Sequence, residues 1–176
     1  MIFIDAQNFR QRLVEMFQDD QIEYDRFLTR LNNMSAYGSL FPQLVRSCYY
    51  DAEPEETEPE LVRKQREGLD SLKRKYQFFE IRLGTAKRDG KGKLKQKGVD
   101  ALIALDMLSK AYENHYEAAI LVSGDEDLLE IVKAVKNLGK HVYGVYSEEH
   151  ISKAMRESFD AGIVLTKDLL SEYRTK

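Results

Sequence analysis

Four aspartates of this chain are placed where a metal-dependent reaction could use them. Three of them directly follow short apolar runs, and the fourth stands in the first turn of an expected helix. The carboxyl ends of parallel strands and the N-terminal ends of the helices between them lie at one edge of a sheet, so we expect these side chains to converge there. The four residues are Asp5, Asp100, Asp125 and Asp127.

A cluster of carboxylates suggests a bound cation, because like charges a few ångströms apart raise one another's pKa values. Hard oxygen ligands suit Mg²⁺ or Mn²⁺, and we expect one of these ions as the cofactor. Asn8 and Ser123 sit beside the acids and could hold a ligand, a water or a phosphate oxygen. Asp106 lies three residues beyond Ile103 on the apolar side of its helix, so we expect a buried hydrogen-bonding partner there, with a direct metal ligand as the alternative.

Each aspartate also has a structural interpretation. Asp125 and Asp127 could cap the helix that follows them, and Asp100 could interact favourably with the dipole of its own helix. Asp5 is harder to explain in this way, because a carboxylate that ends a buried strand needs a cation or hydrogen-bond donors. The sequence leaves both interpretations open for the other three residues.

Other kinds of catalytic site are disfavoured. The histidines His115, His141 and His150 show no metal-ligand or triad spacing. Cys48 is the single cysteine, so the chain has no intramolecular disulfide and no zinc-ligand pattern. The glycines of 84–98 do not form a G-x-G-x-x-G that opens a helix after a strand, which disfavours hydride transfer and nucleotide hydrolysis by a phosphate loop.

A basic segment immediately precedes Asp100. Residues 87–97, KRDGKGKLKQK, carry six cations and one acid, although the whole chain has a net charge of −3. Cations beside an acidic metal site suit a substrate that carries phosphates, and the alternative is an ordinary solvated loop. The lysines that we expect to contact such a substrate are Lys91, Lys93, Lys95 and Lys97.

The elements that must position these residues alternate between strands and helices. Short apolar runs predict the strands, and apolar residues at helical spacing predict the helices. This alternation indicates an α/β fold with a mainly parallel sheet and helices on both faces, and 84–98 is expected to be a loop. Strands are expected at 2–4, 44–50, 78–83, 118–122, 141–146 and 163–165, and helices at 24–37, 59–76, 99–112, 126–138, 151–158 and 168–173.

Length and composition favour one soluble domain. The 176 residues, 43% hydrophobic, fit a single domain spanning 1–176. There is no apolar run near the ~18 residues that a membrane helix needs. Asp5 comes too early for the apolar region of a signal peptide, so we expect a cytoplasmic protein that does not bind membranes. The oligomeric state is left open, with a homodimer as one alternative.

Four segments resemble the NYN family, a branch of the PIN-like nucleases. FIDAQNF at 3–9 resembles its opening strand, and KGVDALIALDML at 97–108 resembles its central helix. LVSGDEDLLEIVKAVKNLGKHVYGV at 121–145 resembles its S-G-D-x-D turn with the helix and strand that follow. SEEHISKAMRESFDAGIVL at 147–165 is similar to its closing helix and strand.

The resemblance implies a PIN-like, Rossmann-like three-layer sandwich with strand order 3-2-1-4-5, in which the strands before Asp5 and Ser123 are neighbours. It also implies a metal-dependent endoribonuclease that hydrolyses RNA, with the four aspartates as the catalytic metal ligands and Asn8 in a supporting position beside Ser123. Two alternatives remain. A non-catalytic RNA-binding or regulatory scaffold would use the same surface, whereas a haloacid dehalogenase-like phosphohydrolase would need an aspartate at the place of Gln7.

Overall fold

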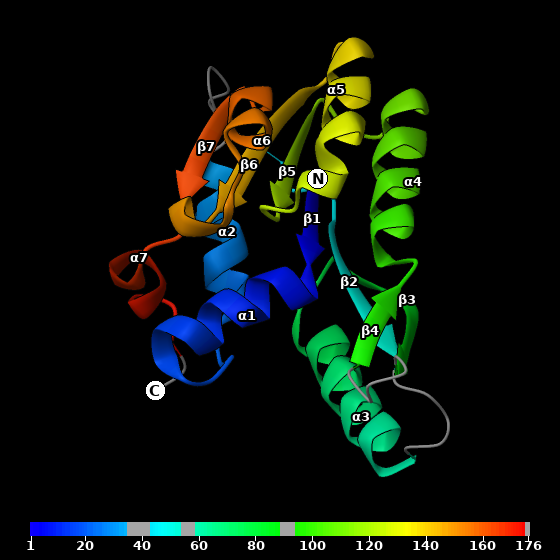
Figure 1. Ribbon diagram of the computed structural model, residues 1–176, viewed down its shortest axis with the longest axis vertical. Helices are drawn as coiled ribbons and strands as arrows, with labels where there is room; N and C mark the ends of the chain where they lie inside the picture. The colour runs from blue at the N-terminus through cyan, green and yellow to red at the C-terminus, as the bar shows by residue number, and fades with distance from the viewer. Residues whose placement is uncertain (35–42, 54–58, 89–93, 175–176) are drawn as a thin grey trace.

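The computed structural model describes residues 1–34, 43–53, 59–88 and 94–174 (Figure 1). Its centre is one seven-stranded sheet in the order β4-β3-β2-β1-β5-β6-β7, in which the edge strand β4 pairs antiparallel with β3 and the other pairs are parallel. The strands are β1 (Ile2–Asp5), β2 (Ser47–Glu53), β3 (Phe79–Arg88), β4 (Leu94–Lys97), β5 (Ala118–Val122), β6 (His141–Tyr146) and β7 (Ala161–Val164). The helices are α1 (Ala6–Phe17), α2 (Tyr24–Met34), α3 (Pro59–Lys75), α4 (Val99–Tyr112), α5 (Leu129–Asn137), α6 (Lys153–Ser158) and α7 (Lys167–Ser171), with short 3₁₀ turns η1 (Glu126–Leu128) and η2 (Glu148–His150).

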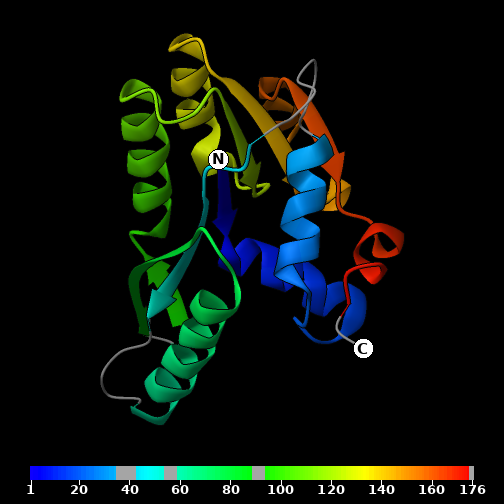
Figure 2. The same cartoon turned by 180° about the vertical axis from the view of Figure 1, so that it is seen from behind.

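Helices cover both faces of the sheet and give three layers. Successive side chains of a strand point to opposite faces, and β1 accordingly buries Ile2 and Ile4 in one apolar cluster and Phe3 in another. The first cluster packs against α1, α2, α3 and α7, and the second against α4, α5 and α6. Figures 1 and 2, seen from opposite sides, show α4 and α5 next to each other on one face, with α2 and α3 on the other.

The observed strand order confirms the order 3-2-1-4-5 and extends it. β1 lies between β2 and β5, with Ile4 opposite Val122, so that Asp5 and Ser123 follow neighbouring strands. β7 adds a sixth parallel strand beside β6. None of the helices in the described ranges has the length and apolarity needed to cross a membrane.

Two elements differ from the sequence prediction. Helix α1 was not predicted, and it begins immediately after Asp5. The segment 84–98 is not simply a loop, because its two ends form the long β3 and the antiparallel β4, with Thr85 opposite Lys97 and Lys87 opposite Lys95. Residues 89–93, with Lys91 and Lys93, lie outside the described residues. We call the paired strands β3 and β4 the basic hairpin.

Candidate metal centre

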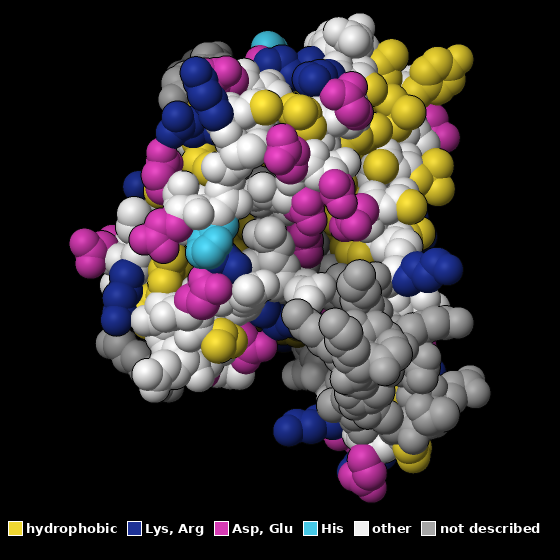
Figure 3. Space-filling view, viewed as in Figure 1, with side chains coloured by type: hydrophobic (Ala, Val, Ile, Leu, Met, Phe, Trp, Pro, Cys, Tyr) yellow, Lys and Arg dark blue, Asp and Glu magenta, His cyan; other side chains and the backbone are white. Residues whose placement is uncertain are grey.

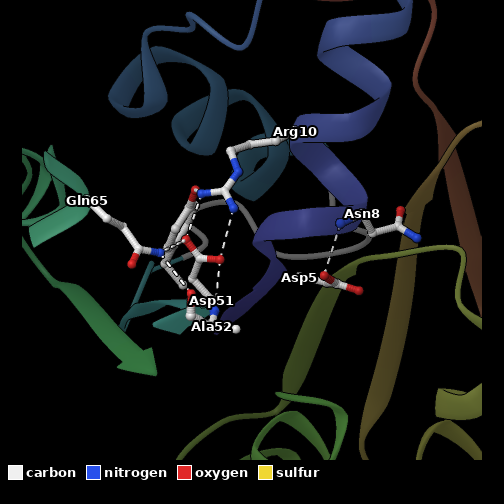
Figure 4. A network of polar contacts seen from close by, with 7 residues as sticks. Asp5, Asn8, Arg10, Asp51, Ala52 and Gln65 are labelled. Carbon is white, nitrogen blue, oxygen red and sulfur yellow. Dashed lines mark hydrogen bonds and ion pairs between the residues drawn. The ribbon is translucent and has the colours of Figure 1, made fainter. Parts of the chain in front are cut away.

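Asp5 is a buried acid at the carboxyl edge of the central strands. It is the last residue of β1 and the N-cap of α1, and only 5% of its surface is exposed. Oδ1 accepts a hydrogen bond from the backbone N–H of Asn8 at 3.1 Å, as Figure 4 shows. Oδ2 accepts one from the hydroxyl of Ser123, also at 3.1 Å. These donors fix the direction of both carboxylate oxygens.

The position of Asp5 makes its negative charge unfavourable in the absence of a cation. Burial raises the pKa of Asp5 to about 6, and the neighbouring charges of Asp100 and Asp125 act in the same direction. The hydrogen bonds from Asn8 and Ser123 lower the pKa but do not offset the burial. A cation at this place would remove the conflict, because an opposite charge within a few ångströms favours the ionised form.

Asp125 is held at the end of β5 by the turn that follows the strand. The hydroxyl oxygen of Ser123 accepts a hydrogen bond from the backbone N–H of Asp125 at 3.1 Å. The Asp125 carboxylate in turn caps η1, since its Oδ1 accepts from the backbone N–H of Asp127 at 3.0 Å. The capping interpretation therefore holds for Asp125, which still has its second oxygen available to a ligand.

Asp100 reaches the same place from α4. It stands in the first turn of the helix, while the N-cap is Gly98, which offers no side chain. Burial raises the pKa of the Asp100 carboxyl group, and the charges of Asp125 and Asp127 raise it further. One carboxylate oxygen from each of Asp5, Asp100 and Asp125 lies within 4.8 Å of the other two. We call these three residues the acidic cluster.

The acidic cluster fits a hard divalent cation. Its donors are carboxylate oxygens from three separate segments, and such oxygens are the ligands that Mg²⁺ and Mn²⁺ prefer. Asp5 is buried, Asp125 is half-buried and Asp100 is exposed, so the cluster opens to solvent on one side. Figure 3 shows acidic side chains gathered in the middle of this face, beside a hollow.

Asp127 is not part of this group of oxygens. Its side chain is exposed on η1, and its contact with Asp125 is made by its backbone N–H. It is still near enough for its charge to raise the pKa of Asp100. The structure thus brings together three of the four predicted carboxylates and leaves the fourth at the margin.

Other predicted residues are placed as follows. Asn8 contacts Asp5 through its backbone, and its side chain is half-buried beside it. Lys97 is exposed at the end of β4, close in sequence to Asp100, and Lys95 lies on the same strand. Asp106 is a buried hydrogen-bonding partner as predicted, because the Tyr50 hydroxyl donates to its Oδ2 at 2.9 Å.

A second polar network lies on the opposite face of the sheet and was not predicted. Asp51 of β2 is buried, and the guanidinium of Arg10 donates to both of its oxygens at 2.6 and 2.9 Å (Figure 4). Gln65 of α3 also donates to Asp51, at 3.1 Å. A cavity of about 410 Å³ between α1 and α3 adjoins this network and includes none of the acidic cluster. These contacts join segments far apart in sequence, so no local pattern could reveal them.

Comparisons with known proteins agree with the fold. The model of the NYN domain family matches residues 1–166 of the chain. The chain is similar in structure to the protein of unknown function VPA0982 from Vibrio parahaemolyticus RIMD 2210633, with a TM-score of 0.70 and 22% sequence identity over 95% of this chain and 92% of that one. No curated protein matches the chain.

Proposed function

Because the chain belongs to the NYN domain family, a branch of the PIN-like nucleases, we propose that it is a metal-dependent endoribonuclease that hydrolyses the phosphodiester bonds of RNA. The observation that carries this proposal is the acidic cluster, whose three carboxylate oxygens lie within 4.8 Å of one another. The cluster sits at the carboxyl edge of a parallel sheet, where α/β folds bind their ligands. The proposed function belongs to a single domain formed by residues 1–176.

Asp5, Asp100 and Asp125 would hold Mg²⁺ or Mn²⁺, with Asp127 at the margin. When bound, such a cation supplies Lewis acid chemistry that activates water and offsets charge on the phosphate. The three carboxylates provide the geometry, since each comes from an element fixed by packing or hydrogen bonds. The attack on phosphorus is made by water, and no side chain of the protein serves as the nucleophile.

Ser123 and the backbone of Asn8 have positioning roles in this proposal. They donate to different oxygens of Asp5 and so hold its carboxylate plane in one orientation. Such outer contacts set the direction of metal ligands and are often nearly as important as the ligands themselves. Ser123 also anchors the backbone of Asp125 and therefore couples two of the three ligands.

The basic hairpin would contact the RNA backbone. It ends at Lys97, directly before the turn at Gly98 and the helix that carries Asp100. Lysines beside the acidic cluster would offset phosphate charge and guide the strand towards the carboxylates. In this role they affect binding of the substrate and leave the chemical step to the acidic cluster.

The proposal is tested by incubating labelled RNA with the purified protein and either Mn²⁺, Mg²⁺ or EDTA. We expect internal cleavage with a metal and none with EDTA. Binding without cleavage under every metal condition would support the RNA-binding scaffold instead.

A further inference from the structure

Helix α1 carries a row of polar residues that begins at the acidic cluster. Asp5, Asn8, Arg12 and Glu15 follow one another at intervals of three, four and three residues, so they lie on one face of the helix. Figure 1 shows α1 lying beyond the ends of β1, β5 and β6. With a rise of about 1.5 Å per residue, Arg12 lies about 6 Å further along the axis than Asn8.

Arg12 is a buried cation with few partners. The residue is 5% exposed, and among the residues that the structure describes its guanidinium donates from Nη1 to Oε2 of Glu15 at 2.5 Å. Its Nε is buried without a hydrogen-bond partner in the same part of the chain. A guanidinium has five N–H donors in a fixed plane, and leaving buried donors unpaired is unfavourable. Arg12 therefore has unused capacity to bind an anion.

The Arg12–Glu15 ion pair is connected to the segment that carries Asp125 through His150. The Arg12 side chain is 6% exposed and that of its partner Glu15 is 43% exposed, so Glu15 is the member of the pair that lies at the surface. The same Oε2 of Glu15 lies 3.4 Å from Nε2 of His150. The backbone carbonyl of His150 in turn packs against Gly124, where a Cβ would lie only 2.8 Å from its oxygen.

These contacts close a ring that includes helix α1. Gly124 stands between Ser123 and Asp125, so the ring runs from the acidic cluster along α1 to Glu15 and returns through His150. Among the residues that the structure describes, Arg12 donates its hydrogen bond to Glu15 and to none of the three carboxylates of the acidic cluster. Its connection to the turn that carries Asp125, through Glu15 and His150, points to the substrate.

We propose that Arg12 binds a phosphate of the RNA strand next to the one that is cleaved, and that Glu15 is the counter-ion that it releases when RNA arrives. This proposal rests on the proposed function. The planar guanidinium matches a phosphate with two parallel hydrogen bonds, and partial burial strengthens such pairs. Arg12 is thus a substrate-positioning residue, and Glu15 competes with the substrate for it.

The test uses two substitutions that break the same ion pair but should change RNA affinity in opposite directions. Arg12→Met keeps the aliphatic stem and removes the phosphate contact, so we expect RNA binding about tenfold weaker, with the salt-dependence slope lower by ~0.7. Glu15→Gln removes the competitor and should strengthen binding. If the Arg12–Glu15 ion pair were only structural, Arg12→Met and Glu15→Gln would change RNA affinity in the same direction.

The measurement is the Kd for a labelled single-stranded RNA, with every variant built on Asp125→Asn so that the RNA stays intact. The control pair is Arg26→Met on α2 and Glu23→Gln immediately before it, which breaks an ion pair of the same spacing that includes no residue of the acidic cluster. We expect each control to shift the Kd less than the corresponding change at Arg12 or Glu15. Thermal melts establish that the variants fold.

Wild-type affinity in Arg12→Met, or equal shifts in the same direction for Arg12→Met and Glu15→Gln, would overturn the proposal. If Arg12→Met does not fold, Glu15→Gln decides alone, because Glu15 is exposed and its loss should not disturb the core. Cleavage by the wild-type protein is assayed separately. If the wild type cleaves RNA but the two substitutions do not change RNA affinity in opposite directions, only the proposed role of Arg12 is refuted. If the two substitutions change RNA affinity in opposite directions but the wild type does not cleave RNA, the nuclease activity is refuted and the RNA contact of Arg12 remains supported.

Discussion

The hydroxyl of Ser123 donates a hydrogen bond to Oδ2 of Asp5 across the ends of two neighbouring parallel strands, at 3.1 Å. The same oxygen of Ser123 accepts a hydrogen bond from the backbone N–H of Asp125. One small side chain therefore sets the position of two carboxylates that come from segments more than a hundred residues apart in sequence. The acidic cluster is assembled by the fold itself, which allows its properties to be tested one residue at a time.

Mn²⁺ or Mg²⁺ should stabilise the folded protein. A ligand that binds only the native state raises the free energy of unfolding, by ~2.7 kcal/mol at a hundredfold excess over Kd. Thermal melts with increasing Mn²⁺ measure this effect. Asp100→Asn should lose most of the shift, and the exposed Asp70→Asn on α3 should retain it. The prediction is wrong if Asp100→Asn and the wild type gain the same Tm.

The stability of the metal-free protein should depend on the protonation of Asp5. Its pKa rises from 3.8 to about 6 on folding, because of burial and the charges of Asp100 and Asp125. Folding therefore takes up a proton between these values, and the stability of the wild type relative to Asp5→Asn is greatest below pH 4 and falls as the pH rises through 6.

In EDTA at pH 7.5, Asp5→Asn should consequently be more stable than the wild type, by on the order of 1–3 kcal/mol. Denaturant titrations of the two proteins from pH 4 to pH 8 give this difference. The comparison isolates Asp5, because burial of the Met1 ammonium, whose pKa falls to about 6, is common to both. A difference that does not change with pH would contradict the prediction.

Asp127 should matter less than Asp125 for cleavage. The structure places oxygens of Asp125 in the acidic cluster, while Asp127 lies at its margin and contacts Asp125 through its backbone. We expect Asp127→Asn to retain more activity than Asp125→Asn by at least tenfold, with kcat as the measured quantity. Equal losses of kcat in Asp127→Asn and Asp125→Asn would mean that Asp127 is a metal ligand equivalent to Asp125, as the sequence motif suggested.

The lysines of the basic segment 87–97 should act in RNA binding. Replacing Lys91, Lys93 and Lys95 with Gln should raise KM and flatten its salt dependence, by a slope of ~0.7 for each lost phosphate contact on a single strand. The kcat should change little, because the carboxylates are untouched. Lys64→Gln with Lys75→Gln on α3 is the control, since both side chains are exposed and α3 contributes no residue to the acidic cluster. An unchanged KM in the triple-lysine variant would show that RNA approaches from elsewhere.

Much of the fold could be predicted because its strands are short, apolar and separated by helical patterns. The convergence of Asp5 and Asp125 also followed from the sequence, since parallel strands end at one edge. Helix α1 was missed because its buried face includes Arg12 beside Phe9 and Leu13, which weakens the apolar periodicity. The hydrogen bond from the backbone N–H of Asn8 to Asp5 could not be foreseen without that helix.

The basic hairpin was missed for a different reason. Lysines and glycines are typical of loops, and the pairing of β4 with β3 depends on backbone hydrogen bonds that no apolar pattern records. The marginal place of Asp127 depends on the 3₁₀ turn that Asp125 caps, a detail of local geometry. The sequence spacing placed Asp125 and Asp127 at the correct edge of the sheet. It could not show that Asp125, and not Asp127, belongs to the group of oxygens formed with Asp5 and Asp100.

The most direct test of the nuclease activity compares the wild type with Asp125→Asn on the same labelled RNA in Mn²⁺. Asparagine keeps the shape of the side chain and an oxygen that can cap η1, so the fold should be preserved while one charge of the acidic cluster is lost. We predict that the wild type cleaves the RNA internally and that the variant binds it with similar affinity but cleaves it slower by a factor on the order of 10² or more. A well-folded Asp125→Asn protein that cleaves as fast as the wild type would contradict the assignment of the acidic cluster as the active site.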